Sequence, residues 1–231
     1  FYRGSLILLC YVDDCLLFAK NQSEIDTLVA ELHKTFVMTD EGDVSTYLGI
    51  KIESHTDSDG NTTIKMSQPS LIQRILDLVQ LSDQRMHDTP AEAKRLLSKD
   101  ASGALRKYTW SYRSLIGMLN YLCATRPEIL FAVHQCARFC EMPKLSHEVA
   151  AKRIARYLKR TSTSGLIMKP DASEGIKCYV DADFAGGWSK DDGDDPSNVY
   201  SRTGYVITYA NCPIIWVSKL QSEIALSTTE A

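Results

Sequence analysis

Residues 5–19 read SLILLCYVDDCLLFA, two short apolar runs on either side of Val12-Asp13-Asp14. Runs of this length are typical of buried strands joined by a tight turn. Two adjacent carboxylates about 4–5 Å apart repel by roughly 3–4 kcal/mol at an effective dielectric near 20. A divalent cation such as magnesium compensates that repulsion and keeps coordination positions open for phosphate. A solvated aspartate turn that binds no metal is the alternative that these residues leave open.

The composition is that of an ordinary globular protein. The chain has 231 residues, enough for one large or two small domains, and its net charge of -3 gives no overall nucleic-acid signal. No apolar run approaches the roughly 18 residues that cross a bilayer. Its seven cysteines include no close Cys-x-x-Cys pair, so a zinc site or a disulfide framework is not indicated. We expect reduced core cysteines, among them Cys10, Cys15, Cys123 and Cys136.

Hydrophobic periodicity predicts the order of helices and strands. In the first part we expect a helix capped by Ser23, a strand over Tyr47–Glu53, a hairpin turn at Asp59-Gly60-Asn61, a return strand over Thr62–Met66 and a helix that begins at Pro69. After a polar connection over residues 82–105, we expect helices over Trp110–Ala124, Pro127–Glu141 and Ser146–Lys159, then strands over Ile176–Val180, Gly204–Tyr209 and Ile214–Ser218.

The last residues contain the start of a further element. Ser227-Thr228-Thr229-Glu230 has the capping-box pattern of a beginning helix. Only Ala231 follows, so this helix would have no body. The chain also begins with Phe1 and not with Met, so we expect it to be a piece of a longer protein, cut at both ends.

Basic residues gather on the predicted helix over Ser146–Lys159 and just beyond it. They are Lys152, Arg153, Arg156, Lys159 and Arg160. Their spacings of one, three and four residues place them on one side of a helix, opposite Ile154 and Leu158. A solvated helix face explains such a pattern without any ligand. Contacts with nucleic-acid phosphates are the functional alternative, and they would be independent of base sequence and sensitive to salt.

The segment Tyr11-Val12-Asp13-Asp14 between apolar strands resembles the active-site hairpin of reverse transcriptases. Further motifs follow in the order seen in copia-type retrotransposon Pol polyproteins. They are Phe36, Tyr47-Leu48-Gly49-Ile50, Met66-Ser67-Gln68, Thr89-Pro90, Tyr112-Arg113-Ser114-Leu115-Ile116-Gly117, Thr125-Arg126-Pro127 and Arg153-Ile154-Ala155-Arg156-Tyr157-Leu158-Lys159. The resemblance covers nearly the whole chain.

This resemblance implies an RNA-directed DNA polymerase that uses Mg²⁺ or Mn²⁺. Asp13 and Asp14 would be two of its three metal-binding catalytic carboxylates, with the third on an earlier strand that precedes Phe1. Residues 47–51 would lie near the primer grip. The implied partners are an RNA/DNA primer–template duplex, deoxynucleotide triphosphates and the rest of the Pol polyprotein. No membrane is implied, and the implied locations are cytoplasmic virus-like particles and the nucleus.

The later motifs resemble the ribonuclease H domain of the same family. They include Tyr179-Val180-Asp181-Ala182-Asp183 and Ser201-Arg202-Thr203-Gly204-Tyr205. Asp181 would be the first metal-binding carboxylate, whereas a strand-end residue that caps a turn is the structural alternative. The family's catalytic Glu would lie two residues beyond Glu230, after the last residue of this chain. One carboxylate cannot hold two metals, so we predict no ribonuclease H activity for this chain alone.

The expected fold is α+β. Residues 1–81 would form the C-terminal part of the reverse transcriptase palm and the start of the thumb. Residues 82–164 would form a mostly helical thumb and connection, and residues 165–231 the N-terminal part of a truncated ribonuclease H-like mixed sheet. Such a chain by itself is expected to be inactive as a polymerase. The alternative function is that of a catalytically inactive nucleic-acid-binding relic of such an element.

Overall fold

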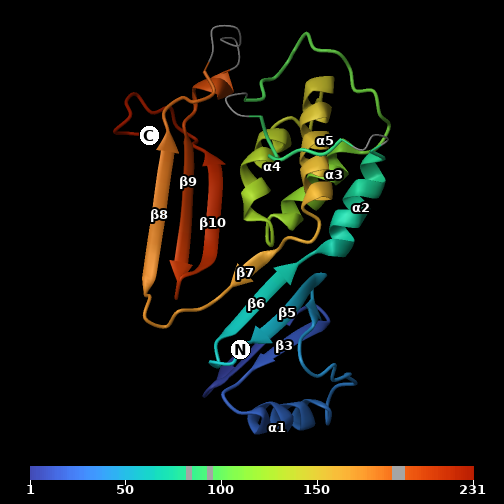
Figure 1. Ribbon diagram of the computed structural model, residues 1–231, viewed down its shortest axis with the longest axis vertical. Coiled ribbons are helices and arrows are strands. Elements are labelled where there is room, and N and C mark those ends of the chain that lie inside the picture. The colour runs from blue at the N-terminus through green and yellow to red at the C-terminus, as the bar shows by residue number, and fades with distance from the viewer. Residues whose placement is uncertain (82–84, 93–95, 189–195) are drawn as a thin grey trace. The chain divides into compact units, whose positions relative to one another are not determined.

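The computed structural model describes residues 1–81, 85–92, 96–188 and 196–231. The chain divides into two compact units, Phe1–Ile52 and Glu53–Ala231, and the boundary falls inside strand β5 (Ile50–Thr56). Helices and antiparallel sheets make up both units, in agreement with the α+β expectation. Figure 1 shows the helices and strands of both units.

The first unit is built on a small antiparallel sheet in the order β1-β2-β3. These strands are Tyr2–Arg3, Leu6–Tyr11 and Asp14–Phe18. Helix α1 (Gln22–Leu32) follows, and Arg3 at one edge of the sheet forms an exposed 3.0 Å ion pair with Glu31 of this helix. The predicted cap at Ser23 is wrong, because Asn21 holds the extended N-cap position and Ser23 lies in the first turn.

The predicted continuous strand over Tyr47–Glu53 is also wrong. Leu48 and Gly49 have positive φ angles of 49° and 73°, and they divide the segment into β4 (Thr46–Tyr47) and β5. Tyr47 pairs directly with Ile50 across this two-residue loop. Two successive positive φ values are the geometry of a tight hairpin turn, which alternation of polar and apolar residues does not reveal.

The second unit begins with the end of β5 and a hairpin that leads into β6 (Thr62–Ser67). The hairpin turn lies where the sequence predicts it, and Asp57 stabilises it by accepting hydrogen bonds from the backbone N–H groups of Asn61 at 2.8 Å and Asp59 at 3.1 Å. β6 then pairs antiparallel with β7 (Leu166–Met168), about a hundred residues later. Residues 166–168 therefore belong to the same sheet as β6.

Four α-helices pack around the main hydrophobic core of this unit. They are α2 (Pro69–Val79), α3 (Tyr112–Leu122), α4 (Leu130–Ala137) and α5 (Leu145–Arg160), with a short 3₁₀ turn over Pro127–Ile129 before α4. Each contributes apolar residues at helical spacing, for example Ile75, Leu119, Val133 and Ile154, all fully buried. The predicted helices are confirmed, with shorter bounds for α3 and α4.

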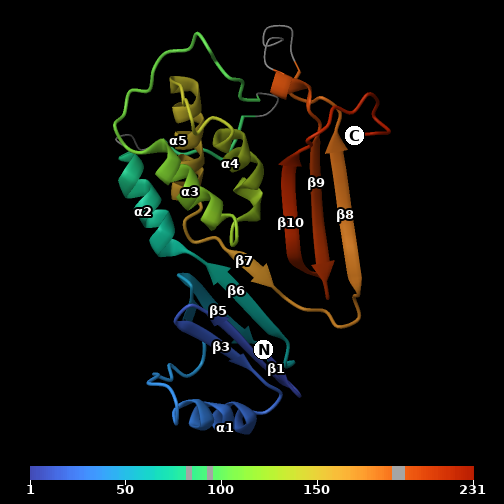
Figure 2. The same cartoon turned by 180° about the vertical axis from the view of Figure 1, so that it is seen from behind.

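A second antiparallel sheet has the order β10-β9-β8. Its strands are β8 (Ile176–Asp183), β9 (Arg202–Tyr209) and β10 (Cys212–Leu220), and a 3₁₀ turn over Pro196–Val199 precedes β9. β10 is the strand beside the helices in both views (Figure 2). There the indole Nε1 of Trp216 donates to the backbone oxygen of Cys123 at 3.1 Å. β8 forms the opposite edge, and all eight of its residues are exposed.

Two smaller expectations need correction. Residues 227–230 form a turn with one backbone hydrogen bond from Glu230 to Ser227, not a helix. The side chain of Glu230 accepts from the backbone N–H of Leu226 at 2.7 Å, outside the four-residue capping box.

Cys10 is exposed, not a core residue, whereas Cys123 and Cys136 are buried as predicted. Within the described residues, no helix combines the length and apolar character needed to cross a membrane.

Candidate active site

The aspartate pair lies at the tip of the β2–β3 hairpin. Tyr11 and Asp14 are direct partners across the two strands, so Val12 and Asp13 form a two-residue loop. Val12 has a φ angle of 53°. A β-branched side chain is strained in this left-handed region, at a cost of roughly 1–3 kcal/mol. Such strain is concentrated at functional sites, and here it lies directly before the two carboxylates in the sequence.

Both carboxylates of the pair are exposed to solvent. In the part of the chain that the structure describes, no lysine or arginine forms an ion pair with Asp13 or Asp14. The charge of Asp14 reaches Tyr47 of β4, where it adds to desolvation in raising the pKa of the phenol. Tyr47 begins the segment expected near the primer grip, so the first unit places that segment within the electrostatic reach of the hairpin.

The residues at this tip can supply part of a metal site. Among the described residues, no group of three or more His, Cys, Asp or Glu side chains is arranged to hold a metal ion. Magnesium in phosphoryl-transfer sites, however, is held by one or two carboxylates, several waters and the phosphates of the substrate. Two adjacent aspartates with exposed, uncompensated charge fit that requirement and leave the remaining positions to other ligands.

Asp181, the third predicted catalytic residue, lies in β8 of the second unit and is exposed there. It is opposite Gly204 of β9, a residue without a side chain. Its neighbour Asp183 accepts a 2.5 Å hydrogen bond from the backbone N–H of Arg202. The carboxylate of Asp183 thus holds the ends of β8 and β9 together, whereas Asp181 is exposed opposite a residue that has no side chain.

The five basic residues predicted to bind nucleic acid lie in different environments on α5. Lys152 is only 7% exposed, and its ammonium nitrogen is 3.1 Å from the centre of the Tyr108 ring. Arg153 contacts Glu92 at 3.7 Å and donates to the hydroxyl of Thr89 at 2.9 Å. Arg160, the most exposed of the five, pairs with Asp88 at 2.9 Å. Arg156 and Lys159 are partly buried.

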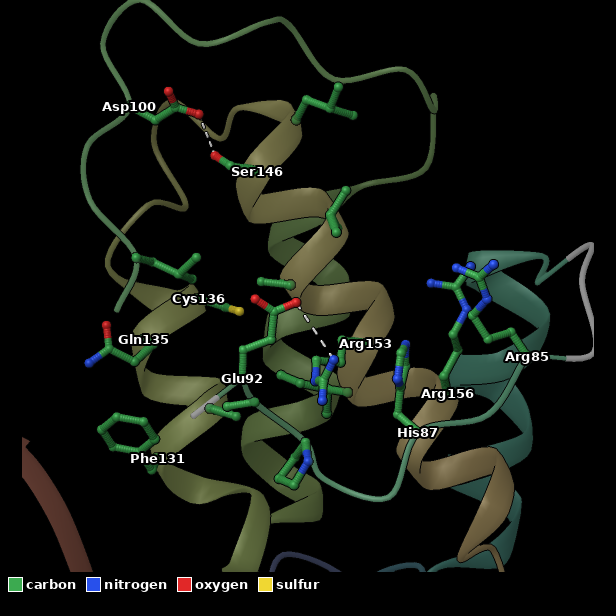
Figure 3. Close-up of a pocket in the computed structure, with 18 of the residues that line it drawn as sticks. Arg85, His87, Glu92, Asp100, Phe131, Gln135, Cys136, Ser146, Arg153 and Arg156 are labelled. Carbon is green, nitrogen blue, oxygen red and sulfur yellow. Dashed lines mark hydrogen bonds and ion pairs between the residues drawn. The ribbon is translucent and has the colours of Figure 1, made fainter. Parts of the chain in front are cut away.

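A cavity of about 500 Å³ lies between α4, α5 and the segments over residues 85–92 and 97–104. Much of its wall is apolar, including Phe131, Val149 and Ile154. Figure 3 shows Arg85, His87 and Arg156 side by side at one end, and Asp100 with Ser146 at the other. Burial, and then the positive charges of Arg153, Arg156 and Arg85, lowers the pKa of His87. The imidazole therefore stays neutral to lower pH beside these arginines.

Arg85 and His87 were not among the predicted site residues. They lie in the polar connection over residues 82–105, which has no periodicity from which a facing helix could be inferred. Only the packing of residues 85–92 against α5 brings them next to Arg153 and Arg156.

Comparisons with known proteins identify the family of the chain. Residues 1–93 match the family model described as reverse transcriptase (RNA-dependent DNA polymerase). The chain is 36% identical over 98% of its length to the retrovirus-related Pol polyprotein from transposon TNT 1-94 of Nicotiana tabacum, of which it spans 17%. It is 32% identical over 99% of its length to the Pol polyprotein from transposon RE1 of Arabidopsis thaliana, of which it spans 15%.

A third relative is of similar size. It is an uncharacterized mitochondrial protein of Arabidopsis thaliana, 32% identical over 97% of this chain and 88% of its own length. No solved structure matches the chain significantly. The family match includes the aspartate hairpin, and the similarity to the polyproteins extends through both units. The chain belongs to the reverse transcriptase family found in copia-type retrotransposon Pol polyproteins.

Proposed function

We propose that the chain forms part of an RNA-directed DNA polymerase in which Asp13 and Asp14 bind divalent metal ions at the primer end. The observation that carries this proposal is the strained two-residue loop at Val12, which presents two exposed, uncompensated carboxylates. A structural turn between two short strands has no need of a β-branched residue at positive φ. The catalytic interpretation explains both the strain and the unpaired charge.

The expected reaction is in-line attack of a primer 3′ hydroxyl on the α-phosphate of a deoxynucleotide triphosphate. A divalent ion bound there would stabilise the charge on the attacking and leaving oxygens. The chain's own contribution is positional. Tyr11 and Asp14 anchor the loop through their pairing, and the backbone at Val12 fixes where the two carboxylates lie. Further metal ligands would come from the rest of the Pol polyprotein, from water and from the nucleotide.

We also propose that β8–β10 is the beginning of a ribonuclease H-like domain with Asp181 as its first metal ligand. Three contiguous antiparallel strands with an exposed aspartate on the edge strand support this assignment. The proposed domain division is residues 1–81 for the palm and the start of the thumb, 82–164 for the thumb and connection, and 165–231 for the ribonuclease H-like part. Without further carboxylates, Asp181 cannot hold two metals, so ribonuclease H activity is not expected from this chain alone. The proposed cellular locations are cytoplasmic virus-like particles and the nucleus.

Duplex contacts are proposed for the accessible end of α5. Arg160 is exposed, and its ion pair with Asp88 lies at the protein surface. Because exposed ion pairs contribute little free energy, a phosphate group can replace that carboxylate at a small energetic cost. Arg153 and Arg156 lie beside the cavity and would contribute less directly. Contacts of this kind do not read sequence, and their strength falls steeply with salt.

The metal-binding step can be tested on this chain itself. Mn²⁺ is titrated into the isotope-labelled chain, and we expect paramagnetic broadening of the amide signals of Tyr11 to Asp14 at the lowest concentrations. The D13N/D14N double variant should lose this selective broadening. Asp59→Asn, which removes an exposed carboxylate from the β5–β6 hairpin, serves as the matched control and should retain it.

The chemistry requires the longer protein. Primer extension is measured with a Pol polyprotein that contains this chain, with and without D13N/D14N. Loss of extension by more than about a hundredfold is expected for a metal-binding carboxylate pair. Extension that persists in the double variant would overturn the proposal. Duplex binding by the parent polyprotein, with no extension at all, would instead favour the inactive relic.

A further inference from the structure

Two cysteines face each other on the same hairpin. Cys10 of β2 and Cys15 of β3 are direct cross-strand partners, one step from the Tyr11–Asp14 pair that closes the loop. Their sulfur atoms are 3.0 Å apart. A disulfide bond is about 2.05 Å long, so the two Sγ atoms need to approach by roughly 1 Å for a bond to form.

The hydrogen-bond pattern of β2 places this pair where cross-strand side chains are closest. Leu8 exchanges both of its backbone hydrogen bonds with Phe1 on the outer side of β2, at 2.8 and 3.0 Å. Because backbone groups alternate in direction along a strand, those of Cys10 also point away from β3. Cys10 and Cys15 are therefore a non-hydrogen-bonded pair, with Cα atoms about 4.5 Å apart. That separation is within the range that disulfides span.

The two thiols are also accessible. Cys10 is exposed and Cys15 is partly exposed, unlike Cys123, Cys136 and Cys212, which are buried. The described cysteines include one further exposed residue, Cys178 of β8. An oxidant in solution can therefore reach Cys10 without opening the fold.

We propose that Cys10 and Cys15 form a reversible oxidation site, in which a peroxide converts the two thiols into a disulfide across the hairpin. The thiolate of Cys10 attacks one oxygen of hydrogen peroxide, which gives a sulfenic acid and, after proton uptake, one water. The sulfur of Cys15 then attacks the sulfur of Cys10. The S–S bond forms, the S–O bond breaks, and the hydroxyl leaves with the proton of Cys15 as a second water.

The consequence of this link is local. It closes a covalent ring of six residues around Val12, Asp13 and their partners, next to the carboxylate pair. Thiol reductants reverse it by exchange. Disulfide formation at this hairpin does not depend on the proposed polymerase function.

Mass spectrometry tests the site directly. The folded chain is treated with hydrogen peroxide, the remaining thiols are alkylated, and the chain is digested with trypsin. Cleavage after Arg3 and Lys20 releases one peptide that contains both cysteines. We expect this peptide to be lighter by two hydrogen atoms and to carry no alkyl group. Treatment with dithiothreitol after the peroxide and before alkylation should restore a peptide that is alkylated at both cysteines. A peptide that is doubly alkylated, or oxidised separately at each sulfur, overturns the proposal.

Two variants sharpen this result. In C15S the second thiol is missing, so Cys10 should accumulate as a sulfenic acid that dimedone traps. C178S removes the other exposed thiol and should leave formation of the internal link unchanged. The link should also form faster in the folded chain than in guanidinium chloride, because the strand pairing holds the two sulfur atoms together. Equal rates in both conditions would count against a site built by the fold.

Discussion

Glu148, on the buried face of α5, accepts a hydrogen bond from Nε of Arg106 at 3.2 Å. The Glu148 side chain is 1% exposed and that of Arg106 is 18% exposed. The guanidinium of Arg106 also lies 4.5 Å from the centre of the Trp110 ring and donates to the Trp110 carbonyl at 2.7 Å. This ion pair therefore attaches the segment before α3 to a helix about forty residues later in the chain.

Replacing Glu148 by alanine should destabilise the second unit strongly. Without the carboxylate, the largely buried guanidinium of Arg106 loses its counter-charge, and we expect the free energy of unfolding to fall by roughly 3 kcal/mol. Urea denaturation followed by tryptophan fluorescence measures this change, since Trp110 lies beside the pair. The exposed Glu141→Ala serves as the control and should change stability by no more than about 0.5 kcal/mol. Equal effects of both variants would show that the ion pair contributes little.

Stability of the second unit should decrease as the pH falls through the range in which histidine titrates. Nε2 of His147 donates to the backbone oxygen of Ser98 at 2.8 Å, and Nδ1 accepts from the backbone N–H of Lys144 at 2.9 Å. Only the neutral ring can do both. Burial lowers the pKa of His147 below its usual 6.5. As the pH falls, His147 therefore becomes protonated in the unfolded chain at a higher pH than in the folded chain. The stability that the neutral ring contributes is fully present above pH 6.5 and is lost as the pH falls below that value.

Unfolding free energies measured across this pH range check the prediction. His147→Gln should reduce the slope of the unfolding free energy against pH. Part of the slope should remain, because the pKa of His87 is also lowered in the folded chain. His33→Gln alters an exposed histidine of the first unit and should leave the slope of the second unit unchanged. A slope of the same size in the His147 variant would contradict the assignment.

Lys152 and Arg160 should have opposite roles on the same helix. Lys152→Ala removes a buried cation from the face of Tyr108, so we expect a loss of about 1–2 kcal/mol in stability and little change in duplex affinity. Arg160→Ala should leave stability nearly unchanged and lower the salt dependence of duplex binding by about one unit of slope. Urea denaturation and anisotropy titrations at several salt concentrations separate the two effects. Equal loss of duplex affinity in both variants would refute this distinction.

Relief of backbone strain at the hairpin tip should be measurable. Glycine adopts a φ of 53° without cost, so Val12→Gly should raise the free energy of unfolding of the first unit by about 1 kcal/mol, after allowance for the greater freedom of glycine in the unfolded chain. Val44→Gly, at an exposed position without positive φ, should lower it. Hydrogen exchange of the β2 and β3 amides reports on this unit alone. Destabilisation by Val12→Gly would show that the loop is not strained.

Several elements were predictable because they depend on short-range chemistry. The β2–β3 hairpin follows from two apolar runs around a polar turn, and α2 follows from Pro69 and the helical spacing of Leu71, Ile72 and Ile75. The strand over residues 47–53 was predicted wrongly, because a turn with two positive φ values leaves no clear mark in the alternation of side chains. The helix expected at Ser227 failed because a capping pattern helps a helix to begin but supplies no residues to continue it.

The sequence by itself determined the family, the aspartate pair and the order of the longer helices and strands, since motifs and periodicity are properties of neighbouring residues. Only the tertiary structure decided which environment each basic residue of α5 occupies. Lys152 and Arg160 look alike in a run of charges, yet one is buried against Tyr108 and the other is exposed beside Asp88. Their difference depends on segments brought to α5 by packing from distant parts of the chain, and no local pattern records which side chain such a segment will cover.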